Sequence, residues 1–207
     1  MSAATEAAPH AVKPRLSGYS SVAIALHWTI ALLMLTNIGL AWYFNTLKGL
    51  AQVAPLGLHK SIGITVLLLT LVRIGWRLAN PSPPLPASMP LWERWLAKAA
   101  HLVFYGLMLG MPLSGWAMVS ASPLIKVYPT VLYGLVHWPA LPFPGLGSDQ
   151  LHDAGKLFRR THNLLAWVAY VTIALHVLAA LKHQFFDRDE VVGRMIPLFR
   201  RKAGAAS

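Results

Sequence analysis

The sequence contains no cysteine among its 207 residues. Disulfide bonds, iron–sulfur clusters, thiolate-bound haem, covalent c-type haem attachment and thiol redox chemistry all need cysteine, so they are excluded. Acidic residues are also scarce, with only 7 Asp and Glu, and none forms a carboxylate pair within an apolar stretch. We find no nucleotide-binding loop, no catalytic Ser or Cys constellation and no zinc motif. Any redox chemistry must therefore use a cofactor held by histidine or a bound small molecule.

Charged residues make up only 12% of the chain, whereas hydrophobic residues make up 56%. A small soluble core cannot bury that much apolar surface, but lipid accepts it directly. Four stretches approach the ~20 apolar residues that cross a bilayer; these are residues 22–44, 58–78, 96–119 and 161–181. The sequence predicts an all-α integral membrane four-helix bundle in one domain over residues 1–207, with a flexible tail at 1–17.

Proline marks two of the connections between these spans. The run Asn80–Pro86 cannot continue a helix and separates the second span from the third. Residues 120–155 form a longer proline-rich connection that also holds several aromatic residues. Aromatic rings favour the membrane interface, so we expect this segment to be an outer interfacial loop, with His137 and His152 as loop residues.

The distribution of Lys and Arg predicts the orientation. With four spans, both termini share a side with the connection between the second and third spans. That side carries twelve Lys and Arg, and the opposite side carries six. The positive-inside rule then places both termini in the cytoplasm. The net charge of +11 flanks apolar spans and forms no continuous patch, so it predicts contact with the lipid surface and not with nucleic acid.

His162 and His176 are the most informative pair, because they stand fourteen positions apart on one apolar stretch. At about 100° and ~1.5 Å per residue, they face within ~40° of the same direction and lie ~21 Å apart along a helix. Imidazole is a common axial ligand of haem iron, and a polar ring inside a bilayer is usually functional. The pair therefore suggests two haem groups, one near each membrane surface.

Two other histidines are expected at the same membrane depths as His176 and His162. His27 lies near the cytoplasmic surface with His176, and His59 lies near the outer surface with His162. Two bis-histidine haem b sites result, each bridging two helices. A lone histidine can instead be a satisfied interfacial residue, and His101 lies at the depth of His27 and could compete for that iron.

Several motifs resemble those of bacterial cytochrome b561. The resemblance runs from about residue 17 to residue 200, and it rests on Leu26-His27-Trp28, His59-Lys60-Ser61-Ile62-Gly63 with Arg73, His101-Leu102 through Tyr105, and the His162/His176 pair. It implies a multi-pass protein of the bacterial inner membrane with two haem b groups. It further implies an oxidoreductase that oxidises superoxide at the outer face and reduces ubiquinone.

The resemblance also directs the search for further site residues. A quinone site on the cytoplasmic side would be lined by His101 and His183, whose rings could relay the protons that quinol formation consumes. Arg73 and Arg77 could pair with haem propionates or extend to the interface. A basic outer surface would attract superoxide; its candidate residues are Lys60, Lys156, Arg159 and Arg160.

Two other functions stay open at this point. The chain could be a haem b anchor subunit that relays electrons between a partner dehydrogenase or hydrogenase and the quinone pool. It could also be a haem-free channel or transporter whose histidines bind substrate or relay protons. A haem absorption spectrum excludes the transporter, and activity of the isolated chain excludes the anchor subunit.

Overall fold

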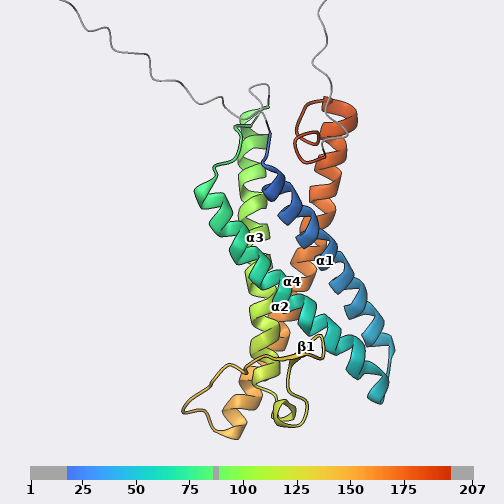
Figure 1. The fold of residues 1–207 in the computed structure, drawn as a ribbon, viewed down its shortest axis with the longest axis vertical. Coiled ribbons are helices and arrows are strands. Elements are labelled where there is room, and N and C mark those ends of the chain that lie inside the picture. Colours follow the sequence, from blue (N-terminus) through green and yellow to red (C-terminus); the bar gives the residue numbers. More distant parts are fainter. Residues whose placement is uncertain (1–17, 86–88, 197–207) are drawn as a thin grey trace, which may run out of the picture.

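The computed structural model describes residues 18–85 and 89–196, so the predicted tail at 1–17 lies outside the described residues. Four long helices dominate this part of the chain (Figure 1). They are α1 (Ser21–Thr46), α2 (Val53–Ala79), α3 (Leu91–Ser120) and α4 (Ser148–Lys182). The short elements are η1 (Gly49–Gln52), η2 (Pro123–Lys126), β1 (Val131–Leu132), β2 (Val136–His137) and η3 (His183–Asp187).

The helices run lengthwise through the molecule and alternate in direction (Figure 1). We call the end of the bundle where α1 starts and α4 finishes the terminal end, and the opposite end, where β1 lies, the loop end. Helix α1 packs on α2, α2 on α3, and α3 on α4. Helix α4 makes few close backbone contacts with α1 or α2, so these backbones are held apart in the described structure.

All four helices are long and apolar enough to cross a membrane. Their outward surfaces expose large hydrophobic side chains, such as Leu32, Trp42 and Leu102, which are 62%, 62% and 75% exposed. A continuous apolar exterior is unfavourable in water and suited to lipid. Few apolar side chains are buried among the described residues, and four of them form one core cluster: Ile30, Ile62, Val66 and Met108.

Hydroxyl groups inside the helices are satisfied locally, as a lipid environment requires. The Ser20 hydroxyl accepts a hydrogen bond from the Ala23 amide at 3.2 Å and caps the start of α1. Ser61 and Thr70 are fully buried in α2, and their hydroxyls donate to backbone carbonyl oxygens one turn earlier, at 2.9 and 2.7 Å. These bonds satisfy the two buried hydroxyls within their own helix.

The fourth helix is much longer than the sequence predicts, and this corrects two expectations. It begins at Ser148 and not at residue 161, so the interfacial connection ends at Gly147 and not at residue 155. His152 is therefore an exposed helical residue and not a loop residue. The first turns of α4 carry acidic and basic residues, so hydropathy predicts a loop there. A helix that extends beyond the bilayer can carry such residues in water.

The connection between α3 and α4 folds back onto α2 at the loop end. Strands β1 and β2 form a short antiparallel hairpin through Tyr133 and Gly134, whose φ angles are 52° and 73°. The left-handed conformation of Tyr133 is strained for a residue with a side chain. Two bonds to α2 hold it: its amide donates to the Ser61 hydroxyl at 2.9 Å, and its hydroxyl lies 2.7 Å from that of Thr65. The loop is thereby fixed next to His59.

Candidate functional site

The structure brings together the two histidines predicted to pair at the terminal end. His27 on α1 and His176 on α4 face one another with ring centroids 6.3 Å apart and planes inclined at 67°. Phe104 of α3 packs edge-on against His176 at 5.1 Å, and Trp28 packs against His27 at 5.3 Å. Three helices therefore converge on this pair of rings.

The same arrangement recurs at the loop end. His59 on α2 and His162 on α4 have ring centroids 6.4 Å apart and planes inclined at 77°. Phe44 packs against His59 at 5.3 Å. Since His176 stands fourteen positions after His162 on one helix, the two pairs are ~21 Å apart along α4.

The ring separations fit one metal ion between each pair. An imidazole nitrogen lies ~1.1 Å from its ring centre and binds a first-row transition metal at ~2.0–2.1 Å, so two imidazoles on opposite sides of one ion have centroids about 6.4 Å apart. The observed values are 6.3 and 6.4 Å. Two neutral imidazoles on opposite faces are the donor set of six-coordinate haem iron. The residues present therefore fit the haem groups that the sequence predicts.

Hydrogen bonds orient the loop-end rings for this role. Nδ1 of His59 lies 3.1 Å from the carbonyl oxygen of Asn37, and Nδ1 of His162 lies 3.1 Å from that of Met111. A carbonyl oxygen only accepts, so each Nδ1 carries the proton and each Nε2 keeps its lone pair. Metal-binding histidines are usually held in this way. Ser114 adds a further contact, because its hydroxyl oxygen lies 3.1 Å from Nδ1 of His162.

Glycines adjust the space around the rings and between the helices. A Cβ atom at Gly115 would lie 3.2 Å from Cε1 of His162, so glycine lets α3 approach that ring closely. At Gly110 a Cβ atom would lie 3.3 Å from Leu165, which is the close helix packing expected of small residues in membranes. At Gly39 and Gly106 an added Cβ would meet no atom within 4 Å, so these positions face open space.

The rival ligand His101 does not take a place in either pair. It is exposed on α3, and its Nδ1 contacts the carbonyl oxygen of Ala97 at 2.6 Å. It lies within electrostatic reach of both His27 and His176. The ring that faces His176 is nevertheless that of His27. His101 is therefore a neighbour of the terminal-end pair.

Arg73 and Arg77 lie together at the terminal end of α2. Both are half-buried and line a cavity of about 670 Å³. Arg73 lies within electrostatic reach of His27, and its guanidinium donates to the carbonyl oxygen of Ala23 at 3.3 Å. The position of Arg73 suits a contact with an anionic group bound beside His27.

The four basic residues predicted to attract superoxide lie on α2 and α4 toward the loop end. Lys60 is half-buried and lines a second cavity of about 520 Å³ between α2 and the hairpin. Arg159 and Arg160 are exposed on α4. Lys156 is also exposed, but it forms an ion pair with Asp153 at 3.1 Å. Its charge is therefore partly balanced, whereas Lys60, Arg159 and Arg160 form no ion pair with any residue that the structure describes.

The sequence model of the family described as prokaryotic cytochrome b561 matches residues 18–198, which include both histidine pairs. The chain belongs to this family. It is therefore a multi-pass protein of the bacterial inner membrane, and a transmembrane haem b electron carrier. This assignment excludes the haem-free channel or transporter.

Three named relatives each match most of this chain. Cytochrome b561 homolog 2 of Escherichia coli (strain K12) is 34% identical over 86% of this chain and 90% of the relative. Probable superoxide oxidase CybB of Yersinia pestis is 32% identical over 86% of this chain and 96% of the relative. Cytochrome b562 of Cereibacter sphaeroides is 29% identical over 86% and 95%. The chain thus spans almost the full length of each relative.

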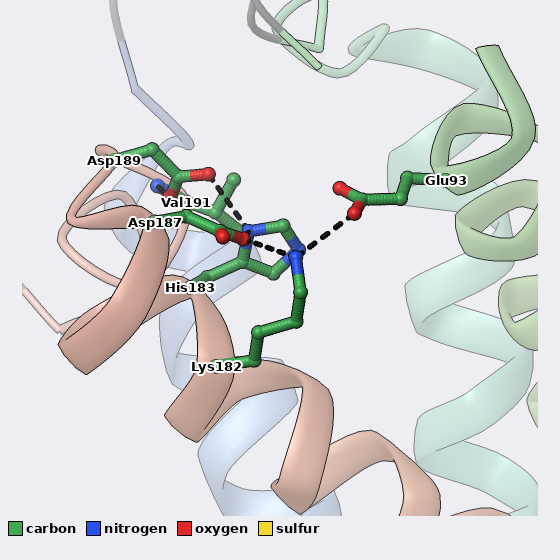
Figure 2. Close-up of polar contacts among 6 residues, drawn as sticks. All are labelled: Glu93, Lys182, His183, Asp187, Asp189 and Val191. Atoms are coloured by element: carbon green, nitrogen blue, oxygen red, sulfur yellow. Dashed lines mark hydrogen bonds and ion pairs between the residues drawn. The ribbon is translucent and has the colours of Figure 1, made fainter. Parts of the chain in front are cut away.

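His183 lies in a polar cluster where α4 ends (Figure 2). Its Nδ1 contacts carboxylate oxygens of Asp189 at 2.7 Å and Asp187 at 3.1 Å. The neighbouring Lys182 bridges Asp187 at 2.6 Å and Glu93 of α3 at 2.9 Å. His183 contacts Asp189 and His101 contacts Ala97, so among the described residues no direct bond joins the two predicted quinone residues.

Sequence reasoning missed the residues that hold the loop-end rings. Asn37 and Met111 act through backbone carbonyl oxygens, which no sequence pattern reveals. Ser114 and Gly115 are a weak signal of a close contact with a ring, because these two small residues of the third span lie at the depth of His59 and His162. Phe44 and Phe104 read as ordinary apolar residues, since helix periodicity alone cannot show which ring meets a histidine.

Proposed function

We propose that this chain is a superoxide:ubiquinone oxidoreductase that carries one haem b at each histidine pair. His27 and His176 would be the axial ligands at the terminal end, and His59 and His162 those at the loop end. The observation that carries the proposal is the repeated ring separation of 6.3 and 6.4 Å, which one metal ion accounts for at both levels. Each haem, when bound, supplies a one-electron redox centre.

The two histidine pairs favour electron transfer as the function of the bound haem groups. A haem held by two histidines would supply one-electron transfer and not oxygen activation. The Nδ1 bonds of His59 and His162 fix the ring orientation before a metal binds. Arg73, which lies within electrostatic reach of His27, is the proposed contact for a haem propionate.

The proposed donor is superoxide, which the loop end would receive at the outer face. Lys60, Arg159 and Arg160, with a weaker contribution from Lys156, give that end a positive surface. Such a field raises the encounter rate of an anion. The 32% identity with a relative named probable superoxide oxidase supports this choice of donor.

The proposed acceptor is ubiquinone at the terminal end, with both termini in the cytoplasm. Two superoxide ions each lose one electron and become oxygen, and one quinone takes up these two electrons and two protons to become quinol. His101 and His183 are the proposed proton relays. His101 lies beside the terminal-end pair, and His183 is held by two carboxylates near the surface.

Purification of the full chain alone tests this proposal. We expect a b-type difference spectrum, rapid haem reduction by an enzymatic superoxide source, and quinol formation when ubiquinone-1 is added. A b-type spectrum that superoxide leaves oxidised would contradict the proposed donor. That result would favour the anchor-subunit alternative, in which a partner protein exchanges electrons with the haem groups.

A further inference from the structure

A short segment after α4 crosses the terminal end of the bundle. We call residues 188–196 the strap. It begins with a reversal of the chain at Arg188, which has a φ angle of 52°. Asp189 then fixes the strap to α4, because one carboxylate oxygen contacts Nδ1 of His183 at 2.7 Å (Figure 2). The other carboxylate oxygen accepts from the Val191 amide at 3.0 Å.

The far end of the strap is tied to two other parts of the fold. The indole of Trp28 on α1 donates to the Met195 carbonyl oxygen at 3.1 Å. The guanidinium of Arg194 donates to the carbonyl oxygen of Pro84, in the connection between α2 and α3, at 2.6 Å. The strap therefore extends from the end of α4 to α1 and to the connection between α2 and α3.

The cavity of about 670 Å³ lies where the strap meets these elements. Its lining includes Met195 of the strap, Trp76 and Arg77 of α2, Tyr105 of α3, and Tyr19 just before α1. Ala23, one turn before His27, also lines it. The cavity thus reaches to one helical turn from His27 along α1, and its volume lies within the ~300–1,000 Å³ that small-molecule sites occupy.

The chemistry of the lining favours a flat molecule with an oxygen acceptor. Tyr19, Trp76 and Tyr105 offer aromatic surface, which packs well against a planar ring. Arg77 has no hydrogen-bond or ion-pair partner among the residues that the structure describes. A half-buried guanidinium is costly to leave unpaired, so it favours a ligand with a carbonyl or anionic oxygen.

We infer that the quinone ring binds in this cavity under the strap, with the guanidinium of Arg77 donating to one of its carbonyl oxygens. The inference rests on the proposed function, in which quinone is reduced at the terminal end. It gives the acceptor site a location one helical turn from His27 along α1. Neither His101 nor His183 is among the residues that line the cavity. His183 acts on it indirectly, through Asp189 and the strap.

The test uses the full chain with both haem groups, in nanodiscs of zwitterionic lipid. Binding of ubiquinone-1 is measured by equilibrium dialysis in the unchanged protein, in Arg77→Met and in Arg77→Lys. Loss of a charged hydrogen bond predicts that Arg77→Met raises Kd by roughly tenfold or more, while Arg77→Lys restores part of the affinity. The haem spectrum should stay unchanged. Lys98→Met is the matched control, because Lys98 lies over the Trp95 ring and outside the cavity.

A second measurement does not depend on these variants. An azido-ubiquinone analogue should label peptides that include residues 71–84 or 191–196. Ser82→Trp, in a connection that lines the cavity, should block the labelling without changing any membrane helix. Labelling confined to the neighbourhood of His101, or an unchanged Kd in Arg77→Met, would overturn the inference.

Three further outcomes are distinguishable. If Arg77→Met loses a haem but keeps its quinone affinity, Arg77 contacts a propionate and the inference is wrong. If the protein binds ubiquinone-1 but the analogue labels neither of the two cavity segments in zwitterionic lipid, the quinone site lies elsewhere and the inference is again wrong. If the unchanged protein neither binds ubiquinone-1 nor reduces it, the proposed function itself fails.

Discussion

Gly115 of α3 lies directly against the ring of His162 on α4. A Cβ atom at this glycine would come within 3.2 Å of Cε1 and 3.4 Å of Nδ1. The neighbouring Ser114 contacts the same ring through its hydroxyl. The α3–α4 interface therefore determines the position of the ring that, with His59, forms the loop-end pair.

A larger residue at Gly115 should weaken the loop-end haem selectively. We expect Gly115→Val to displace the His162 ring and to lower haem affinity there by roughly tenfold, the scale found for residues that orient metal ligands. Haem content per chain, measured by the pyridine haemochrome assay, should fall toward one. Gly75→Ala is the control, since no atom lies within 4 Å of an added Cβ at Gly75. Equal haem loss in both variants would count against a specific role for Gly115.

Helix periodicity predicts much of this architecture from the sequence. The 100° rotation per residue places His162 and His176 on one face of α4, and the structure puts each ring opposite its predicted partner. Residue order and apolar length also yield four spans. These features are local, so a single sequence contains them.

Two kinds of feature could not be predicted in the same way: the charged start of a long helix, and bonds between residues far apart in sequence. The early part of α4 carries Asp153, Lys156 and Arg159, so hydropathy reads it as a loop, although the backbone continues as a helix there. The strap and the Tyr133 hairpin rest on bonds between residues far apart in sequence, such as Trp28 with Met195. No periodic pattern encodes such bonds.

Charge at the loop end should control the rate of superoxide oxidation. Salt screens exposed charges over ~10 Å at 0.1 M, so raising the ionic strength should slow superoxide-driven haem reduction. Arg159→Gln and Arg160→Gln should each reduce this salt dependence. Lys156→Gln should have a smaller effect, because Asp153 already balances that charge. Stopped-flow rates that do not change with salt would contradict electrostatic attraction at this surface.

The bond between His183 and Asp189 should matter for the acceptor and not for haem binding. We expect His183→Ala and Asp189→Asn each to keep both haem groups and to raise KM for ubiquinone-1, because either change releases the strap from α4. Since the two residues act through one contact, the double variant should be no worse than the single variants. Additive losses in the steady-state rates would show that they act separately.

The predicted orientation has a direct test. Both termini should lie in the cytoplasm, because Lys and Arg favour that side. Green fluorescent protein fused after Ser207 should therefore fluoresce, and alkaline phosphatase at the same position should be inactive. Alkaline phosphatase inserted in the hairpin after Gly134 should be active. The reverse pattern would place the basic loop end in the cytoplasm and remove the proposed route for superoxide.

Haem content of single histidine variants tests the central claim most directly. The purified chain should contain two haem b groups, and His162→Ala and His176→Ala should each contain one, with distinct reduced spectra. His152→Ala should keep both, because His152 is an exposed residue of the same helix outside both pairs. Two haem groups retained in either His162→Ala or His176→Ala would contradict the assignment of the paired histidines as axial ligands.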